Sequence, residues 1–401
     1  MKPEYIKQFE KLGFGMFVHF GLYSVLGKGE WVYYTLNSED KKKYFSEEFA
    51  NKFNPKKDWA TKLVKTAKAA GAKYITLTTK HHDGFFLYDS KGLTNWDSTK
   101  LGPKRDLVKE FVDACNKEGI VPFFYHALLD WHNEDYNNDF PKYIDFLIKS
   151  VELLCTNYGK IGGLWFDGFW DKPNEDWQFD RLYKTIRKYQ PEAMIINNTG
   201  MSDTGAIGHY EIDSVTYERS APTMVNAPDG KERAGEMCEV FGQHWGYTKN
   251  DLDFKSFREI LYSLIDCRNS NCNFLLNCGP KANGYLTELD KEYFRRLGVF
   301  IRKNKNFIYN VKKADISSPD CVILQDDSYY YAVIKDVLMS VNPNAQLEKG
   351  TTKVTIPYHK IKSAKYLDCK DPVSLSEDGH TIYVKPFDYG EARAVRVVRF
   401  K

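Results

Sequence analysis

Eight short apolar runs, separated by longer amphipathic segments, occupy the first three quarters of the chain and constrain its fold more than any other feature. Parallel strands joined by helical crossovers have this pattern. The runs are Phe14–His19, Tyr74–Lys80, Val121–His126, Gly163–Asp167, Met194–Asn198, Ser214–Glu218, Met237–Phe241 and Phe274–Cys278. A closed (β/α)8 barrel needs eight strands, so the sequence predicts an α/β fold of that class.

Segments with apolar residues three or four positions apart predict the helices that cover these strands. They are Asp58–Ala70, Asp106–Lys117, Tyr143–Asn157, Trp177–Tyr189 and Phe254–Arg268. The connections after the sixth and seventh runs carry little helical pattern, so we expect an irregular barrel. A last helix, Thr287–Ile308, closes this unit.

The pattern changes after this helix to alternating strands, which are typical of an all-β domain. The predicted strands are Cys321–Leu324, Tyr329–Ile334 and Val354–Ile356, with turns at Ser317–Asp320, Asn342–Asn344 and Glu377–Gly379. We therefore expect a barrel over residues 1–310 and a C-terminal β-sandwich domain over residues 311–401.

Composition and charge exclude several classes of protein. The 401 residues include 57 basic and 54 acidic side chains, and the net charge of +3 provides no extended basic field for nucleic acid. No run reaches the ~18 apolar residues of a membrane span, and the N-terminus has no signal-peptide pattern. The eight cysteines lack the paired short spacing of zinc or redox sites. We expect a cytoplasmic protein with free thiols, and the oligomeric state stays open, a homo-oligomer included.

The run Gly162–Gly168 delivers a carboxylate, Asp167, directly after bulky apolar residues and before a glycine. Catalytic groups of βα barrels come from the C-terminal ends of strands. Other polar residues that stand at predicted strand ends are His19, His81, His82, Tyr125, His126, Asn197, Asn198 and Glu218. Their collection at one rim predicts a polar pocket of the size of a sugar.

A metal hydrolase is the first alternative, because histidine and aspartate at barrel strand ends also bind zinc. His81 and His82 are adjacent, and neighbouring strand residues point to opposite faces unless the strand ends or bulges there. No His-Glu-x-x-His or comparable spacing is present. We therefore expect no metal and no cofactor.

Carboxylate chemistry fits these residues better. Glycoside cleavage needs one ionised carboxylate at the anomeric carbon and one protonated acid at the leaving oxygen. Asp167 is the candidate nucleophile, and we expect Lys80 and the nearby histidines to keep it ionised. Glu218 ends the sixth predicted strand, where a catalytic residue belongs, whereas Glu236 falls at the start of the seventh, which is the opposite rim. Glu218 is the favoured acid, with Glu236 as the alternative.

These residues, taken in order, resemble the α-L-fucosidases of glycoside hydrolase family 29. The matching motifs are Phe14–Gly21, Gly29–Trp31, Lys80–Phe85, Leu164–Gly168 and Asn273–Pro280. The resemblance spans residues 14–280, and the C-terminal β domain also fits the family layout. It implies an exo-acting barrel enzyme that hydrolyses terminal α-L-fucosyl linkages of fucosylated oligosaccharides or glycoconjugates and retains the anomeric configuration.

The resemblance also implies roles for single residues, with Asp167 matching the family nucleophile. The positions that match residues lining the fucose pocket are His19, Glu30, Trp31, His81, His82 and Tyr125, with Trp245 at a further aromatic position. Glu218 lies in a segment that resembles the one carrying the acid/base in many members. Glu236 lies in a segment that resembles the one carrying it in a narrower-specificity branch.

One departure from the family pattern concerns an arginine that follows the fifth strand in many members. This chain reads Asn197-Asn198-Thr199 there, and Arg219 or Arg233 is a candidate replacement. The departure keeps two alternatives open. They are an α-glycosidase that acts on a related sugar such as a galactoside, and a sugar-binding homologue without catalysis.

Overall fold

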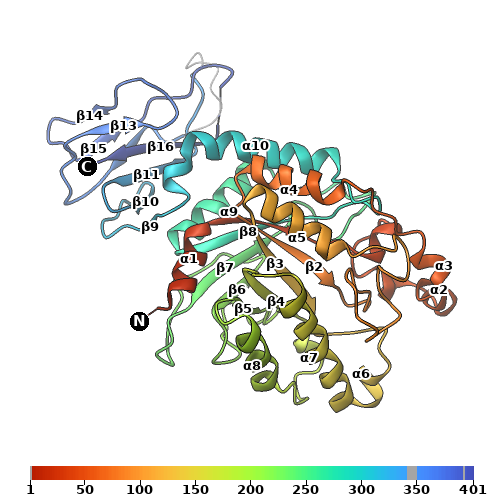
Figure 1. Cartoon of the computed structure of the whole chain (residues 1–401). Helices are drawn as coiled ribbons and strands as arrows, with labels where there is room; N and C mark the ends of the chain where they lie inside the picture. The colour runs from red at the N-terminus through yellow and green to blue at the C-terminus, as the bar shows by residue number, and fades with distance from the viewer. Residues whose placement is uncertain (1, 341–349, 392) are drawn as a thin grey trace.

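Eight parallel strands hydrogen-bond in chain order from β1 to β8, and β1 also pairs with β8, so the sheet closes into a barrel (Figure 1). The computed structural model describes residues 2–340, 350–391 and 393–401. The barrel strands are β1 Phe14–Val18, β2 Tyr74–Lys80, β3 Val121–Ala127, β4 Gly163–Asp167, β5 Met194–Asn197, β6 Ser214–Glu218, β7 Ala234–Glu239 and β8 Cys272–Cys278. The predicted (β/α)8-like barrel is confirmed.

Strand β7 spans Ala234–Glu239, whereas the sequence pattern predicts Met237–Phe241. The first two residues of β7 are small and carry no apolar signal. Gly235 belongs there because β8 approaches closely: a Cβ on Gly235 would lie 2.4 Å from the sulfur of Cys272. The earlier start moves Glu236 from the edge of the strand into its interior.

Helices cover the outside of the barrel. The α-helices are α1 Glu4–Leu12, α2 Ser38–Tyr44, α3 Glu47–Ala50, α4 Trp59–Ala70, α5 Leu107–Glu118, α6 Asp135–Asn138, α7 Phe140–Asn157, α8 Phe179–Tyr189, α9 Phe257–Asn269 and α10 Glu288–Asn304. Four short 3-10 turns are η1 Leu22–Val25, η2 Val32–Thr35, η3 Phe169–Asp171 and η4 Lys305–Phe307. Helix α1 precedes the barrel and lies against β5, β7 and β8.

The barrel is irregular, as expected, but not at both of the expected places. Every residue between β1 and β8 is described, and in this range the connections that contain no α-helix are those after β5 and β6. The expectation of a helix-poor connection after β7 is wrong, because α9 follows it. Gly200, Gly205 and Gly208 interrupt the connection after β5, and Pro222 and Pro228 interrupt the one after β6.

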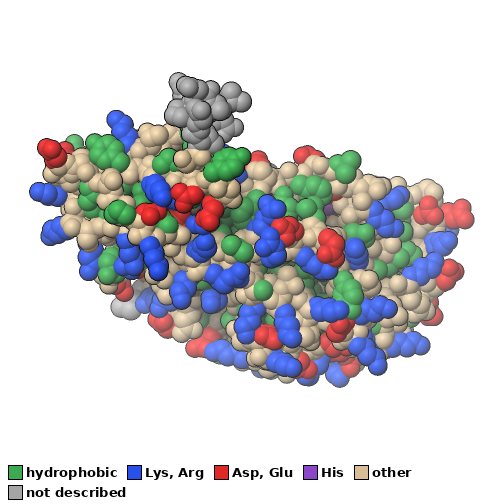
Figure 2. Space-filling view, turned by 90° about the horizontal axis from the view of Figure 1, so that it is seen from above, with side chains coloured by type: hydrophobic (Ala, Val, Ile, Leu, Met, Phe, Trp, Pro, Cys, Tyr) green, Lys and Arg blue, Asp and Glu red, His purple; other side chains and the backbone are tan. Residues whose placement is uncertain are grey.

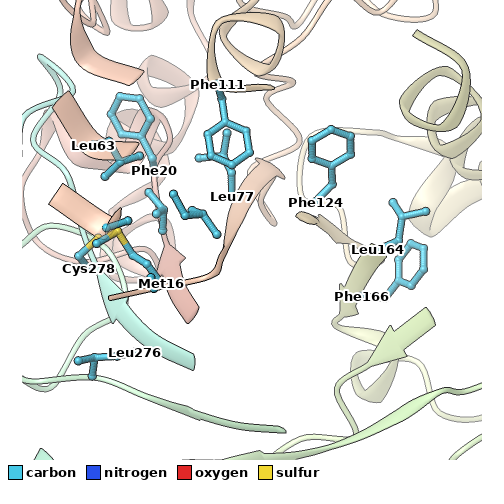
Figure 3. Close-up of a cluster of buried hydrophobic side chains, with 14 of the residues drawn as sticks. Met16, Phe20, Leu63, Leu77, Phe111, Phe124, Leu164, Phe166, Leu276 and Cys278 are labelled. Carbon is cyan, nitrogen blue, oxygen red and sulfur yellow. The ribbon is translucent and has the colours of Figure 1, made fainter. Parts of the chain in front are cut away.

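Outward-facing strand residues pack under these helices (Figure 3). Met16, Leu77 and Phe124 come from β1, β2 and β3, while Leu63 and Phe111 come from α4 and α5. Each of these side chains is at most 2% exposed. Burying a side chain of this kind contributes about 1.5–3 kcal/mol. This layer holds the strands in place, so their ends present a rigid rim.

Alternate residues of each strand point into the barrel instead. Phe17, Tyr74, Tyr125 and Trp165 are aromatic and almost fully buried there. The rings of Tyr125 and Trp165 stack with their centroids 5.6 Å apart. The interior is a packed core that forms a floor below the C-terminal rim.

Two antiparallel sheets follow the barrel and enclose a second core, as predicted for a β-sandwich. One sheet has the order β13-β16-β11-β10-β9 and the other β12-β15-β14. The strands are β9 Lys312–Lys313, β10 Val322–Gln325, β11 Tyr330–Lys335, β12 Lys353–Thr355, β13 Ala364–Tyr366, β14 Ser374–Leu375, β15 Thr381–Tyr383 and β16 Val395–Phe400. The predicted turn at Asn342–Asn344 lies outside the described residues.

The C-terminal sheets lie beside α9 and α10 in Figure 1, and helix α9 of the barrel packs against β9 and β10. Asp266 on α9 pairs with Lys335 of β11 at 2.8 Å. Tyr262 on the same helix donates a hydrogen bond to Asp336 at 2.7 Å. The two parts therefore share polar contacts as well as a packed boundary.

The surface carries charges of both signs. Figure 2 shows Lys and Arg side chains interspersed with Asp and Glu on the face that it draws. None of the described helices combines the length and the apolarity that crossing a bilayer requires. All eight cysteines are unpaired, and six of them are buried.

Candidate active site

A pocket of about 620 Å³ opens at the C-terminal ends of the barrel strands. The predicted site residues that line it are His19, Glu30, Trp31, His81, His82, Tyr125, Asp167, Glu218 and Trp245. Its other lining residues are Phe17, Trp165, Trp170, Asn198, Gly200, Met201, Ser202, Arg219, Cys238 and Gln243. Of the residues predicted to be catalytic or to bind the sugar, Glu236 alone does not line this pocket.

Two residues of the expected polar rim point away from the pocket. His126 bonds with Ser150 of α7 at 2.9 Å, and Asn197 donates to Tyr183 of α8 at 2.9 Å. Each of them is a direct neighbour of a residue that faces inward, so the alternation along a strand turns it outward.

Both adjacent histidines reach the pocket because β2 ends before them. The strand stops at Lys80, and its register with β3 shifts just before this residue. The alternation of faces therefore no longer applies. His81 stacks on Tyr125 with ring centroids 5.6 Å apart, and His82 Nε2 lies 3.6 Å from Asp167 Oδ2.

Lys80 lies outside the pocket, although the sequence predicts that it keeps Asp167 ionised. Its ammonium group is fully buried and pairs with Asp130 at 2.9 Å. Burial, and then the charge of Lys80, lower the pKa of His82 to about 3. Lys80 therefore helps to keep the neighbouring imidazole neutral, and other groups stabilise the Asp167 carboxylate.

Three donors surround the Asp167 carboxylate. Trp170 Nε1 and Asn198 Nδ2 lie 3.1 and 3.2 Å from Oδ1, and Tyr125 Oη donates to Oδ2 at 3.0 Å. Burial raises the pKa of Asp167, and these hydrogen bonds oppose the shift because they stabilise the charged form. Trp170 reaches Asp167 because the chain reverses at Gly168, which has a φ of 100°.

Glu218 ends β6 and faces the same pocket. Burial, and then the charge of Asp167, raise the pKa of Glu218 to about 7. A hydrogen bond from Asn198 and the charge of Arg219 act in the opposite direction. The Glu218 carboxyl can therefore carry a proton near neutral pH while three donors stabilise the anionic form of Asp167. Glycoside cleavage by two carboxyl groups requires this division.

Asn198 holds the two carboxyl groups together. Its Nδ2 donates to Asp167 Oδ1 at 3.2 Å and to Glu218 Oε2 at 2.7 Å. Thr216 donates to Oδ1 of the same amide at 3.0 Å, which fixes the end of the amide that faces the carboxyls. Two carboxyl groups within reach of one nitrogen fit the ~5–5.5 Å spacing of retaining glycosidases better than the wider spacing of inverting ones.

Glu236 lies one layer deeper, in the barrel interior. Its strand partner on β6 is Thr216, two residues before Glu218. The Glu236 carboxyl is 1% exposed and accepts hydrogen bonds from Tyr74 Oη and, at 2.9 Å, from Trp165 Nε1. Burial raises its pKa to about 7. The geometry favours Glu218 as the proton donor, because Trp165 separates Glu236 from the pocket.

A hydrogen-bonded chain of residues fixes the polar wall of the pocket. Glu30 Oε2 accepts from the backbone N–H groups of Trp245 and Gly246 at 3.0 and 2.7 Å. Asn277 donates to the Trp245 carbonyl at 2.7 Å, and its Oδ1 accepts from His19 Nδ1 at 2.7 Å. Burial lowers the pKa of His19 to about 3 and raises that of Glu30. A neutral His19 keeps its Nε2 as an acceptor for a ligand hydroxyl.

Aromatic rings form the floor and the mouth. Phe17 lies in the floor, with its ring centroid 5.1 Å from that of Trp165 and 5.8 Å from that of Trp245. At the mouth Trp31 stacks on Trp170 at 5.9 Å, and 36% of Trp31 is exposed. The pocket thus combines apolar walls with a few fixed polar groups, as small-molecule sites do.

The arginine that is missing after β5 is not replaced by Arg233. Arg233 is buried and pairs with Asp229 at 2.5 Å, and it does not line this pocket. Arg219 does line it, and its guanidinium bonds to the Gln243 carbonyl and side chain at 3.3 Å. Arg219 has a φ of 50°, a conformation that non-glycine residues adopt rarely. Thr199 itself is buried.

Sequence reasoning did not single out Trp170 or Gln243, and it placed Asn198 at the rim without a role. The signal for Trp170 was its position three residues after the carboxylate, past a glycine that permits a tight turn. Gln243 meets Arg219 only because two loops far apart in the sequence lie together, so no local pattern could identify it.

The fold and the two carboxyl groups define a class of protein. Among the described residues, no group of three or more His, Cys, Asp or Glu side chains is arranged to hold a metal ion. One carboxylate lies under three donors at a barrel strand end, beside a second carboxyl of raised pKa. This is the arrangement of a barrel glycoside hydrolase that works with two carboxyl groups.

Comparison with known proteins identifies the family. The family model described as Alpha-L-fucosidase matches residues 2–306. Tissue alpha-L-fucosidase of Macaca fascicularis is 28% identical over 334 residues, which cover 76% of this chain and 69% of that protein. Plasma alpha-L-fucosidase of Homo sapiens is 25% identical over 422 residues, which cover 96% and 89%.

Solved structures agree with this result. Alpha-L-fucosidase isoenzyme 1 from Paenibacillus thiaminolyticus has a TM-score of 0.85 and 31% identity, covering 99% of this chain and 98% of its own. A Bacteroides thetaiotaomicron GH29 α-L-fucosidase, solved as a trapped covalent intermediate with 2-fluoro-fucosyl fluoride, has the same fold, with a TM-score of 0.81 at 23% identity and coverage of 100% and 96%. The chain therefore belongs to the α-L-fucosidase family, glycoside hydrolase family 29.

Proposed function

We propose that this chain is an exo-acting, retaining α-L-fucosidase that removes terminal α-L-fucosyl residues from fucosylated glycans. Asp167 acts as the nucleophile and Glu218 as the acid/base. The observation that carries the proposal is the hydrogen bonding of both carboxyl groups to the Asn198 amide, with the raised pKa of Glu218 beside it. Membership of the family supports the substrate.

In the first step Asp167 attacks the anomeric carbon and the bond from that carbon to the leaving oxygen breaks. Glu218 transfers its proton to that oxygen, so the aglycone leaves as a neutral alcohol. Trp170 and Asn198 donate to Oδ1 of Asp167 and Tyr125 donates to Oδ2, so the carboxylate is held in position. The lone pairs that accept none of these hydrogen bonds remain for attack on the anomeric carbon. The product is a covalent fucosyl–Asp167 ester.

In the second step Glu218, now ionised, takes a proton from water while the water oxygen attacks the anomeric carbon. The ester bond to Asp167 breaks, and two inversions give α-L-fucose with retained configuration. The covalent intermediate trapped in the Bacteroides relative supports this route.

The remaining pocket residues bind the sugar. Glu30 and the neutral histidines His19, His81 and His82 present fixed acceptors and donors to the hydroxyl groups. The aromatic floor around Phe17 offers an apolar surface that suits the methyl group of fucose.

Hydrolysis of 4-nitrophenyl α-L-fucoside by the purified chain, with chelator present, tests the proposal. Proton NMR of the product in the first minutes should show α-L-fucose before mutarotation. First appearance of the β anomer would contradict the retaining mechanism. Binding of fucose without any turnover would instead identify a non-catalytic homologue, and an equal or greater kcat/KM on the matching α-L-galactoside would contradict the role of the methyl group.

A further inference from the structure

A second cavity lies at the end of the barrel opposite the active site. Its volume is about 670 Å³, and it shares no lining residue with the active-site pocket. Helix α1 borders it on one side, and Gly235 near the start of β7 borders it on another. The chain around Val311, where the C-terminal sheets begin, closes it. The N-terminal face of such barrels serves stability, so the cavity has no part in the proposed chemistry.

A buried arginine lines this cavity. Arg268 is 2% exposed, and its guanidinium donates to the carbonyls of Cys272 and Val311 at 2.8 and 3.1 Å and to Asn273 Oδ1 at 3.3 Å. Among the described residues no carboxylate lies within ion-pair distance of it, and its Nε has no hydrogen-bond partner. A buried charge without an opposite charge is costly, and an anion in the cavity would remove that cost.

The rest of the lining is also basic. The charged lining residues are Lys2, Lys7, Lys11, Arg233, Arg268 and Lys312, against Glu10, Asp326 and Asp327. Glu10 is already paired with Lys2 at 2.7 Å. Asp326 accepts two backbone N–H groups and the Tyr331 hydroxyl. Lys7 pairs with Glu4 at 3.9 Å and Arg233 with Asp229 at 2.5 Å, so these two cations are also neutralised. Within the described part of the chain, Lys11, Lys312 and Arg268 form no ion pair, and they outnumber the two remaining carboxylates, Asp326 and Asp327, by one charge.

We propose that this cavity binds a small phosphorylated ligand. Arginine and lysine groups that converge on one space bind phosphate through charge-assisted hydrogen bonds. The described lining residues include no aromatic ring on which a nucleobase could stack. The shared chemistry is therefore a phosphate group, which either inorganic phosphate or a sugar phosphate supplies.

Titration calorimetry of the full chain with inorganic phosphate, glucose 6-phosphate and glucose, at constant ionic strength, tests the proposal. We expect saturable binding of at least one phosphate compound and none of glucose. Tighter binding of glucose 6-phosphate would identify a sugar phosphate, and equal binding would identify the free anion. Absence of saturable binding by both phosphate compounds would overturn the proposal.

The double variant Lys11→Gln/Lys312→Gln should weaken this binding by about 10-fold or more, because two charge-assisted contacts are lost. The matched control Lys57→Gln/Lys184→Gln removes two exposed charges elsewhere and should bind like wild type. Equal affinity of the two double variants would overturn the proposal. Arg268→Met should abolish binding, and the lysine variants decide the matter if this variant does not fold. Fucosidase activity should be unchanged in both lysine variants, so this test is independent of the proposed function.

Discussion

The carboxyl groups of Asp167 and Glu218 share one hydrogen-bond donor, the side-chain amide of Asn198, which lies 3.2 Å from the first and 2.7 Å from the second. The two groups also repel each other electrostatically, which contributes to the raised pKa of Glu218. They therefore titrate as a pair, and the three donors at Asp167 favour the state in which Asp167 is ionised and Glu218 carries the proton.

Replacing Asp167 should remove nearly all turnover. Asp167→Asn keeps the shape of the side chain but cannot form the ester, so kcat should fall by roughly 10⁴-fold or more. Initial rates on 4-nitrophenyl α-L-fucoside measure this, and an unchanged melting temperature shows that the fold is intact. A wild-type rate would mean that Asp167 is not the nucleophile. As an independent check, Asp167→Gly with azide should form β-L-fucosyl azide.

Replacing Glu218 should change the pH dependence as well as the rate. In the wild type kcat/KM should fall as pH rises through about 7, because Glu218 must be protonated to act as an acid. Glu218→Gln should lose this alkaline fall and slow natural fucosides by about 10²–10⁴-fold. The activated 4-nitrophenyl substrate should suffer less, because its leaving group needs little protonation. An intact alkaline limb in the variant would exclude Glu218 as the acid.

Glu236 should matter for stability more than for catalysis. Its pKa is raised from 4.5 to about 7 in the folded chain, so folding takes up a proton between these values. Stability linked to Glu236 is therefore fully present at low pH and is lost as pH rises through about 7, by at most on the order of 3 kcal/mol. Glu236→Gln should flatten this part of the profile of unfolding free energy against pH. Loss of the alkaline limb of kcat/KM in this variant would reassign the acid to Glu236.

Arg219 should tune the acid. Its positive charge lowers the pKa of Glu218, so Arg219→Gln should move the alkaline limb of kcat/KM to higher pH. Arg219→Lys keeps the charge and is the matched control, with an alkaline limb close to that of wild type. A limb that shifts to lower pH, or that shifts equally in both variants, would show that charge is not the cause.

Most of the site could be predicted because each strand ends where an apolar run meets a polar residue. This transition is sharp at Val18–His19, at Phe166–Asp167 and at Tyr217–Glu218, and the structure brings all three polar residues into one pocket. The barrel topology then predicts that these residues lie together, because the C-terminal ends of parallel strands meet at the same rim.

Other features depend on tertiary structure that no local pattern contains. Ala234 and Gly235 are small, so the apolar pattern does not show that β7 begins there. The position of Glu236 below the rim of the barrel follows from its pairing with Thr216 of β6. Lys80 belongs to a strand end but faces Asp130 on the outer side, because β2 shifts its register there. The start of β7 and the direction of the Lys80 side chain depend on how neighbouring strands pair, and the spacing of residues in the sequence does not specify this pairing.

Asp167, Asn198 and Glu218 stand at the ends of three consecutive strands, β4, β5 and β6, whereas Trp31 and Trp170 at the mouth belong to the connections that follow β1 and β4. Neighbouring strands are about 4.8 Å apart, and β5 lies between β4 and β6, so the barrel sets the distance between the backbones that carry the two carboxyl groups. A change in the length or sequence of these connections would therefore alter which leaving groups fit, while the separation of the two carboxyl groups, and with it the proposed retention of configuration, would stay the same.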